Sequence, residues 1–281
     1  MTRRPATHRT DRARREGLGG DPTSEKSARS ATALVTGPTA GIGHAFAHQL
    51  AARGYDLVLV ARNEGRLEQT AAGLRAAHGI EVEVLQADLS SRTEMARVEA
   101  RLADPDRPVD LLVNNAGFGL KGRFLDNTAD AETAMLDVLV TAVLRLSHAA
   151  LVAMAERGHG GIINVSSVAG FLPRGSYSAA KAWVNSFSAW AANEYRSRGV
   201  KVMSLCPGFT KTEFHERMNV SRGSVPDFLW LDADNLVATA LSDFDMGRVY
   251  SIPSLQYKVI ATASRLIPTS LLQRFQTLGR K

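Results

Sequence analysis

From residue 31 onwards, short apolar runs alternate with longer stretches in which apolar residues recur at the spacing of a helix. Short apolar runs bounded by polar residues are typical of buried strands, and a period of about 3.6 residues is typical of helices. The predicted strands are 31–36, 56–61, 81–87, 109–114, 161–166 and 200–206. The predicted helices are 42–53, 64–78, 92–103, 129–155 and 177–197. This alternation predicts an α/β fold, a doubly wound parallel sheet with helices on both faces.

The residues with the most unusual chemistry come directly after these predicted strands. They are Gly37, Arg62, Asp88, Asn114, Ser167 and Pro207. Parallel strands end at one edge of their sheet, and such sheets bind ligands beyond that edge. The sequence therefore predicts one shared site there.

Length and composition favour one folded domain with an extension at each end. The chain has 281 residues, and 44% of them are hydrophobic, which is ordinary for a folded protein. Residues 1–30 contain eight basic and four acidic side chains and few aliphatic ones, so we predict a disordered basic tail. Residues 31–252 then form the domain, and residues 253–281 form a C-terminal extension. Because the net charge of +6 is concentrated in the tail, we expect no nucleic-acid partner.

Cysteine content and hydropathy indicate the compartment. Cys206 is the only cysteine, which excludes an internal disulfide and agrees with a reducing compartment, so we expect a cytoplasmic protein. The most apolar segment, 138–154, is interrupted by Arg145 and His148. We therefore expect no membrane-spanning helix.

Tyr177 and Lys181 are four residues apart in a predicted helix, so their side chains share one face. A free phenol has a pKa near ~10 and exchanges protons poorly at neutral pH, whereas a neighbouring cation lowers that pKa. The pair is therefore a candidate acid/base group. The spacing alone is common, and its weight comes from the motifs that accompany it.

A glycine-rich turn follows the first predicted strand. Its glycines are Gly37, Gly41 and Gly43. Glycine allows a tight turn and lets a pyrophosphate reach the N-terminus of the next helix. The spacing is G-x-x-x-G-x-G, and residues 114–117 read Asn-Asn-Ala-Gly. With these motifs ahead of a serine and the pair Tyr177 and Lys181, the chain resembles the short-chain dehydrogenase/reductase family over about residues 31–252.

The resemblance implies a Rossmann fold that transfers hydride between a nicotinamide cofactor and a carbonyl carbon. It implies that Tyr177 gives a proton to the carbonyl oxygen, that Lys181 lowers the pKa of Tyr177, and that Ser167 stabilises the oxyanion. The implied catalytic residues are Ser167, Tyr177 and Lys181. The implied cofactor-binding residues are Gly37, Thr39, Gly41, Ile42, Gly43, Asp88, Leu89, Asn114, Ala116, Gly117, Tyr177, Lys181, Pro207, Gly208 and Thr210.

The end of the second predicted strand favours NADP(H) over NAD(H). An NAD site usually carries a carboxylate there for the ribose 2′-hydroxyl, whereas a 2′-phosphate needs an arginine. Here Ala61 takes the acidic position and Arg62 follows it, with Glu64 close enough in sequence to compete for Arg62. We therefore count Arg62 among the cofactor-binding residues.

Two positions depart from the family pattern. Ser167 precedes Tyr177 by ten residues, a shorter interval than the family commonly has, and Ser166 is the alternative catalytic serine. Leu139 stands where the family usually carries an asparagine that orders a water for the proton relay. Because leucine cannot order that water, two alternatives follow. Either the chain is an enzyme whose relay uses other groups, or it is a catalytically weak NADP(H)-binding sensor or scaffold protein.

The C-terminal third suggests an apolar substrate and an extra contact surface. Large apolar residues after the last predicted strand are Phe209, Phe214, Met218, Phe228 and Trp230. In relatives this segment forms a substrate lid, so we expect an apolar ketone or aldehyde, or its alcohol, although ordinary core packing explains the same residues.

Residues 255–281 predict two short basic amphipathic helices separated by Pro268. Packing on the domain, contact with a second subunit and weak contact with an anionic membrane surface are three alternatives for them. Since relatives are often dimers or tetramers, the resemblance implies a homo-oligomer.

Overall fold

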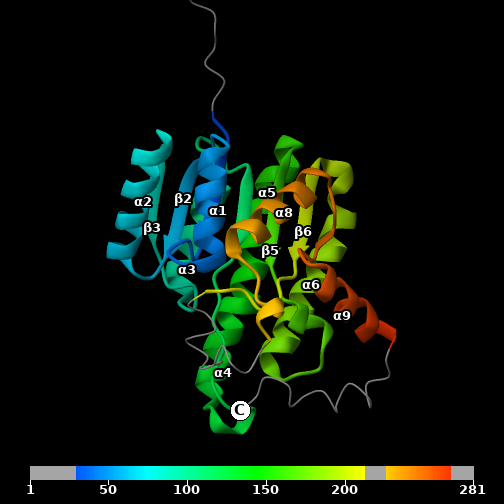
Figure 1. The fold of residues 1–281 in the computed structure, drawn as a ribbon. Coiled ribbons are helices and arrows are strands. Elements are labelled where there is room, and N and C mark those ends of the chain that lie inside the picture. The colour runs from blue at the N-terminus through cyan, green and yellow to red at the C-terminus, as the bar shows by residue number, and fades with distance from the viewer. Residues whose placement is uncertain (1–29, 213–225, 267–281) are drawn as a thin grey trace, which may run out of the picture.

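The computed structural model describes residues 30–212 and 226–266, with side chains as far as residue 263. The described chain forms a seven-stranded parallel sheet covered by helices on both faces (Figure 1). The predicted tail at 1–29, Phe214 and Met218 in the predicted lid, and the predicted helix after Pro268 lie outside the described residues. The predicted fold class, a doubly wound parallel sheet in a single Rossmann domain, is confirmed.

The strands occur in the order β3-β2-β1-β4-β5-β6-β7. They are β1 (Thr32–Thr36), β2 (Asp56–Ala61), β3 (Val82–Gln86), β4 (Leu111–Asn114), β5 (Gly160–Val165), β6 (Val200–Leu205) and β7 (Tyr250–Ser251). The α-helices are α1 (Gly41–Ala52), α2 (Glu64–His78), α3 (Arg92–Ala103), α4 (Ala129–Leu136), α5 (Ala142–Arg157), α6 (Ser176–Glu194), α8 (Ala233–Asp245) and α9 (Leu255–Leu266). Because β1 pairs with both β2 and β4, the order of the strands reverses at β1, which is where such sheets bind ligands.

Successive residues of each strand face two separate hydrophobic cores. Val35 of β1 packs with side chains of α1, α2 and α8 on one face of the sheet. Its neighbour Leu34 packs with side chains of α3, α5 and α6 on the other face. Burial on both faces explains why β1, β2 and β4 have apolar residues at successive positions without alternating polar ones.

Capping residues and non-local pairing decide where the elements begin and end. Both α2 and α3 cover the predicted residues, because the side chains of Asn63 and Ser91 accept backbone hydrogen bonds at their first turns. The predicted helix 129–155 is instead divided into α4, a π-helical turn η2 (Asp137–Thr141) and α5. Neither β7 nor α8 was predicted. The two residues of β7 form a strand only because they pair with β6.

The helical stretch 129–157 is long and apolar enough to cross a membrane, by length and composition alone. In the fold it is a core helix. Leu146, Ala150 and Met154 are buried between α3 and the sheet. The contact with α3 and the sheet therefore accounts for the buried part of its apolar composition.

Candidate active site

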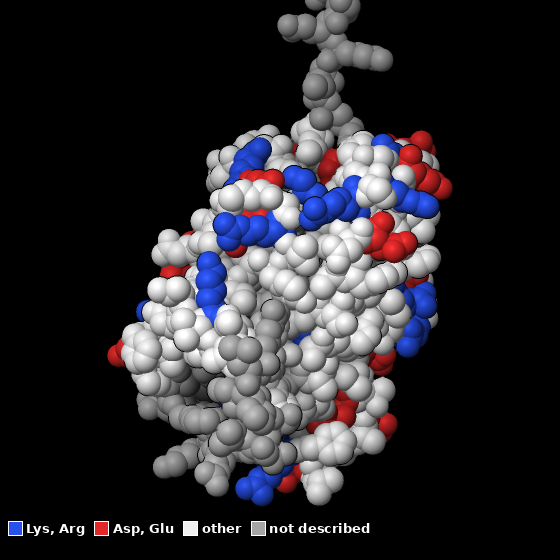
Figure 2. Space-filling view, turned by 90° about the vertical axis from the view of Figure 1, so that its right-hand side faces the viewer, with Lys and Arg blue, Asp and Glu red and all other residues white. Residues whose placement is uncertain are grey.

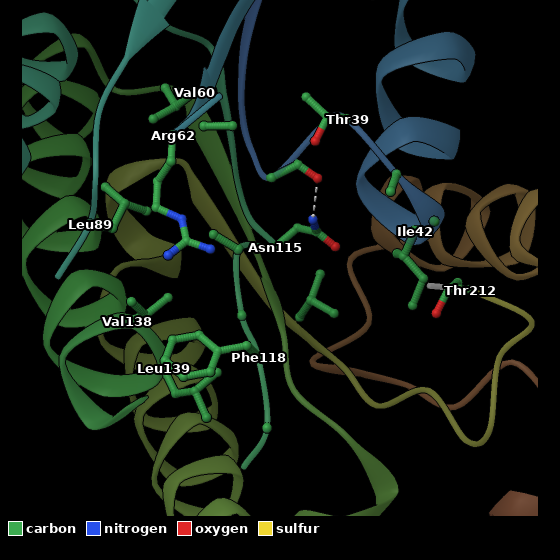
Figure 3. A pocket seen from close by; sticks show the side chains of 18 of the residues that line it. Thr39, Ile42, Val60, Arg62, Leu89, Asn115, Phe118, Val138, Leu139 and Thr212 are labelled. Carbon is green, nitrogen blue, oxygen red and sulfur yellow. Dashed lines mark hydrogen bonds between the residues drawn. The ribbon is translucent and has the colours of Figure 1, made fainter. Parts of the chain in front are cut away.

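A cleft of about 520 Å³ opens along the carboxyl ends of the central strands (Figure 3). The predicted site residues that line it are Gly37, Thr39, Gly41, Ile42, Arg62, Asp88, Leu89, Ala116, Gly117, Ser167, Tyr177, Lys181, Pro207, Gly208 and Thr210. Gly43 and Asn114 are the two predicted cofactor residues that do not line the cleft. The predicted clustering at the sheet edge is therefore present in the structure.

Close backbone packing shapes the turn between β1 and α1. Gly37 and Gly41 have φ angles of 67° and 57°, in the left-handed region that favours glycine. A Cβ atom on Gly43 would lie 2.1 Å from the carbonyl oxygen of Gly37, so Gly43 supports the turn from behind. The first turn of α1 has no side-chain cap and no acidic residue. Its backbone N–H groups are thus directed at a place suited to an anion such as a pyrophosphate.

Asn115 holds the glycine turn against β4, although it was missed as a site residue. Its Nδ2 donates to the carbonyl oxygens of Thr36 at 2.9 Å and Gly37 at 3.1 Å. The Thr36 hydroxyl in turn accepts a hydrogen bond from the backbone N of Asn115 at 2.9 Å. Its position in the Asn-Asn-Ala-Gly motif was the available signal, but the side-chain partners become evident only in three dimensions.

The preceding residue, Asn114, faces the interior. Its Nδ2 donates to the Ser147 hydroxyl at 3.1 Å and to Oδ1 of Asn164 at 2.9 Å. Since Asn114 is buried and does not line the cleft, it joins β4 to α5 and β5. It supports the sheet edge on which the cofactor motif stands.

Arg62 directs its guanidinium into the cleft beside Leu89 and Val138 (Figure 3). Within the described chain this guanidinium forms neither a hydrogen bond nor an ion pair, and Glu64 does not pair with it. Its charge is therefore available for a phosphate group. Arg66, one helical turn further on, was missed, and it also lines the cleft. Its Nη2 donates to the carbonyl oxygen of Thr39 at 3.0 Å, which ties α2 to the glycine turn.

Tyr177 and Lys181 lie one turn apart on α6 and both line the cleft. The Tyr177 hydroxyl is hydrogen-bonded to the Ser167 hydroxyl. Lys181 Nζ lies 5.8 Å from the centroid of the Tyr177 ring and donates to the carbonyl oxygen of Val165 at 2.7 Å. The three predicted catalytic side chains are thus brought together at one wall of the cleft.

The two candidate serines have different partners. Ser166 is buried, and its hydroxyl donates to the backbone carbonyl of Lys181 at 2.9 Å, which fixes α6 to β5. Ser167 accepts from the backbone N of Ala169 at 3.1 Å and contacts the Tyr177 hydroxyl. Of the two, only Ser167 contacts the phenol.

Burial controls the proton affinities of Tyr177 and Lys181. It raises the pKa of Tyr177 well above that of a free phenol, and the hydrogen bond with Ser167 lowers it only in part. Burial also lowers the pKa of Lys181 to about 8. The expectation that Lys181 lowers the pKa of Tyr177 is therefore corrected. Desolvation is the largest influence on the pKa of the phenol, and the Lys181 ammonium is directed at the Val165 carbonyl instead.

Leu139 fills the position where an asparagine was expected. It is fully buried, lies in the π-helical turn η2 and lines the cleft beside Gly117. A Cβ atom on Gly117 would lie 2.8 Å from the Leu139 side chain. The widened turn, in which the backbone N of Ala142 donates to the carbonyl oxygen of Asp137, forms with leucine in place.

The C-terminal extension supports the loop that follows β6. The ring of Tyr257 in α9 covers Gly208 so closely that a Cβ atom there would lie 2.0 Å from the ring. The Tyr257 hydroxyl accepts from the backbone N of Phe209 at 3.1 Å and donates to the carbonyl oxygen of Leu229 at 2.8 Å. Tyr257 was missed because its hydrogen-bond partners are 48 and 28 residues away in sequence.

Comparison with known proteins decides the family. A family model described as short chain dehydrogenase matches residues 31–222. This chain belongs to the short-chain dehydrogenase family. A very-long-chain 3-oxoacyl-CoA reductase from Anas platyrhynchos is 33% identical to this short-chain dehydrogenase over 223 residues, which are 75% of this chain and 68% of the relative. For three such relatives the match covers 58 to 68% of their own length.

Two solved structures resemble this short-chain dehydrogenase closely. A short-chain dehydrogenase from Sphingobium yanoikuyae in complex with NADPH has a TM-score of 0.77 and 36% identity, and the match covers 84% of this chain and 94% of that chain. A bulky-bulky ketone specific alcohol dehydrogenase from Comamonas testosteroni has a TM-score of 0.74 and 33% identity, and the match covers 84% of this chain and 92% of that chain. The protein is therefore an oxidoreductase of this family, and its fold is one that binds a nicotinamide cofactor.

Proposed function

We propose that this protein reduces bulky apolar ketones with NADPH and runs the reverse oxidation with NADP⁺. The observation that carries the proposal is the cleft itself. It joins the glycine turn and the Arg62 guanidinium, which has no partner among the described residues, to the hydrogen-bonded pair Tyr177 and Ser167. We call the part with the glycine turn and Arg62 the cofactor end of the cleft, and the part with Tyr177 and Ser167 the catalytic end. One ligand lying along this cleft would contact both ends.

The residues at the cofactor end suit NADPH. The N–H groups of the first turn of α1, which no side chain caps, suit its pyrophosphate. The Arg62 guanidinium suits the 2′-phosphate that distinguishes NADPH from NADH. No carboxylate takes the position of Ala61, where an NAD site would have one. The Sphingobium relative, solved with NADPH, adds support. Bound NADPH would supply the hydride.

At the catalytic end, Tyr177 would donate the proton to the carbonyl oxygen. Burial keeps its phenol protonated at neutral pH, so the proton is available whenever substrate enters. Ser167 would donate a hydrogen bond to the same oxygen as negative charge develops there, an effect worth about 3 kcal/mol. Lys181 would hold the cofactor ribose.

The substrate class is proposed from the apolar lining. Phe118, Ala134 and Leu139 line the cleft near the catalytic residues, and Phe209 packs against Trp230 in the following loop with ring centroids 5.6 Å apart. The names of two relatives, a 3-oxoacyl-CoA reductase and a bulky-ketone alcohol dehydrogenase, fit a substrate with large apolar groups on the carbonyl.

The test is a panel of steroid ketones, 3-oxoacyl thioesters and diaryl ketones, followed through the loss of NADPH absorbance. We expect turnover with at least one bulky ketone and much slower turnover with acetone, because a small ketone leaves the apolar wall uncovered. Leu139 favours one competing function, a catalytically weak cofactor sensor. Tight NADPH binding in a titration, without oxidation of NADPH by any member of the panel, would support the sensor and exclude the reductase.

A further inference from the structure

The outer face of α9 and the neighbouring turn η6 (Asp227–Leu229) expose large apolar side chains. The exposed fractions are 75% for Leu255, 61% for Val259, 38% for Ile260 and 66% for Phe228. We call these four side chains the α9 face. The opposite side of the same helix is also apolar, because Tyr257 and Ala261 are buried against the domain. An amphipathic surface helix needs only one apolar side, so the second one calls for a partner.

The α9 face is held rigidly beside the cleft. The Tyr257 hydroxyl donates to Leu229, the residue next to Phe228, so α9 and η6 form one surface. The same Tyr257 side chain covers Gly208 in the cleft wall. In Figure 1, α9 extends from the body of the domain on the side that faces the viewer in Figure 2. Figure 2 shows Lys and Arg gathered in the upper part of that side.

The sequence of the segment gives the α9 face a sign of charge. Residues 255–281 contain five basic side chains and no acidic one. Lys258 stands exposed between Leu255 and Val259. The turn η6 also carries the exposed carboxylate of Asp227, next to Phe228. The α9 segment itself is apolar and basic without carboxylates, which is complementary to anionic lipid headgroups above acyl chains.

We propose that the α9 face docks on an anionic lipid bilayer. Leu255, Val259 and Phe228 enter the boundary between headgroups and acyl chains, and Lys258 pairs with lipid phosphate. If the protein acts on bulky apolar ketones as proposed above, the docked orientation presents the cleft to a membrane-dissolved substrate. The docking itself does not depend on that activity.

The experiment is sedimentation of the full chain with vesicles of phosphatidylcholine alone, and of phosphatidylcholine and phosphatidylglycerol in equal parts. The test variant is Val259→Asp. The matched control is Val152→Asp on α5, another exposed valine at 51% on a different face. We expect the wild type and the control to pellet with the mixed vesicles, and Val259→Asp to bind at least about tenfold more weakly. Lys258→Gln should lose about fivefold on mixed vesicles only.

Other outcomes overturn the proposal. Equal binding by the wild type and Val259→Asp would exclude the α9 face as the docking surface, as would failure of the wild type to pellet. If Val259→Asp instead lowers the mass measured by analytical ultracentrifugation, while the wild type ignores vesicles, the face is a contact between copies. Turnover of a water-soluble ketone should be the same in Val259→Asp and the wild type. Loss of docking is therefore distinguishable from loss of the proposed activity.

Discussion

The two ends of the cleft are built from different kinds of contact. At the cofactor end, backbone meets backbone, and Gly43 lies so near the Gly37 carbonyl that one added carbon would collide with it. At the catalytic end, side chains meet: Lys181 is buried, Tyr177 and Ser167 are half-buried, and hydrogen bonds hold them in place. The cofactor end should lose cofactor binding when its shape changes. The catalytic end should lose activity when its chemistry changes at constant shape.

The largest expected effect isolates chemistry from shape at the catalytic end. Tyr177→Phe keeps the ring and removes only the hydroxyl, so turnover of a bulky ketone should fall about 10³-fold. NADPH affinity and the midpoint of urea unfolding should change little. Stopped assays at saturating NADPH measure turnover, and a fluorescence titration measures NADPH affinity. The control is Tyr195→Phe, which lies outside the cleft. Intact turnover in Tyr177→Phe would show that the catalytic proton comes from elsewhere.

The next effect concerns the buried ammonium at the same end. The pKa of Lys181 is about 8 in the folded protein, against 10.5 for an ordinary lysine, so the unfolded chain binds more protons between these two pH values. The free energy of unfolding should therefore rise with pH through that window, by up to about 3 kcal/mol.

Urea unfolding from pH 8 to pH 10 measures this slope. Lys181→Met should show no such increase in the free energy of unfolding with pH. Lys201→Met, which removes an exposed lysine, should show the same increase as the wild type. Equal slopes for the wild type and Lys181→Met would mean that the Lys181 ammonium is not desolvated in the folded state.

A third effect tests shape at the cofactor end. Gly43→Ala would place a Cβ atom 2.1 Å from backbone, which cannot move aside as a flexible side chain can. We expect a loss of about 2 kcal/mol in the free energy of unfolding and weaker NADPH binding. The matched control is Gly73→Ala in α2, where nothing lies within 4 Å and alanine should stabilise by about 0.5 kcal/mol. If both variants behave alike, the close approach does not constrain the turn.

The smallest effect tests the charge at the cofactor end. Arg62→Gln should raise the Kd for NADPH about tenfold and leave the Kd for NADH unchanged, because only NADPH carries the 2′-phosphate. The exposed Arg97 on α3 lies outside the cleft, so Arg97→Gln should change neither value. If Arg62→Gln weakened the binding of NADPH and NADH equally, Arg62 would have a general role in the cleft and no specific contact with the 2′-phosphate.

The pattern along the chain was sufficient for the fold class and for most of the cofactor end. Strand and helix periods are local properties, so α2 and α3 could be located from their own residues and capping side chains. The glycine spacing and the Asn-Asn-Ala-Gly motif also lie within short segments. They indicated the family, which the match over residues 31–222 confirms.

The pattern along the chain could not reveal contacts between distant segments. Nothing local marks Tyr250 and Ser251 as a strand, Asn115 as the partner of Gly37, or Tyr257 as the cover of Gly208. The choice between Ser166 and Ser167 likewise depends on which hydroxyl reaches α6 and which reaches the phenol.

The proton affinities of Tyr177 and Lys181 show most clearly what the sequence determined and what only the tertiary structure decided. By itself, the sequence determined that a phenol and an ammonium share one helical face, because a spacing of four residues in a helix guarantees it. Only the tertiary structure decided that burial, and not the neighbouring charge, dominates both pKa values. The physical reason is that desolvation depends on every segment packed around a group, whereas spacing depends on one.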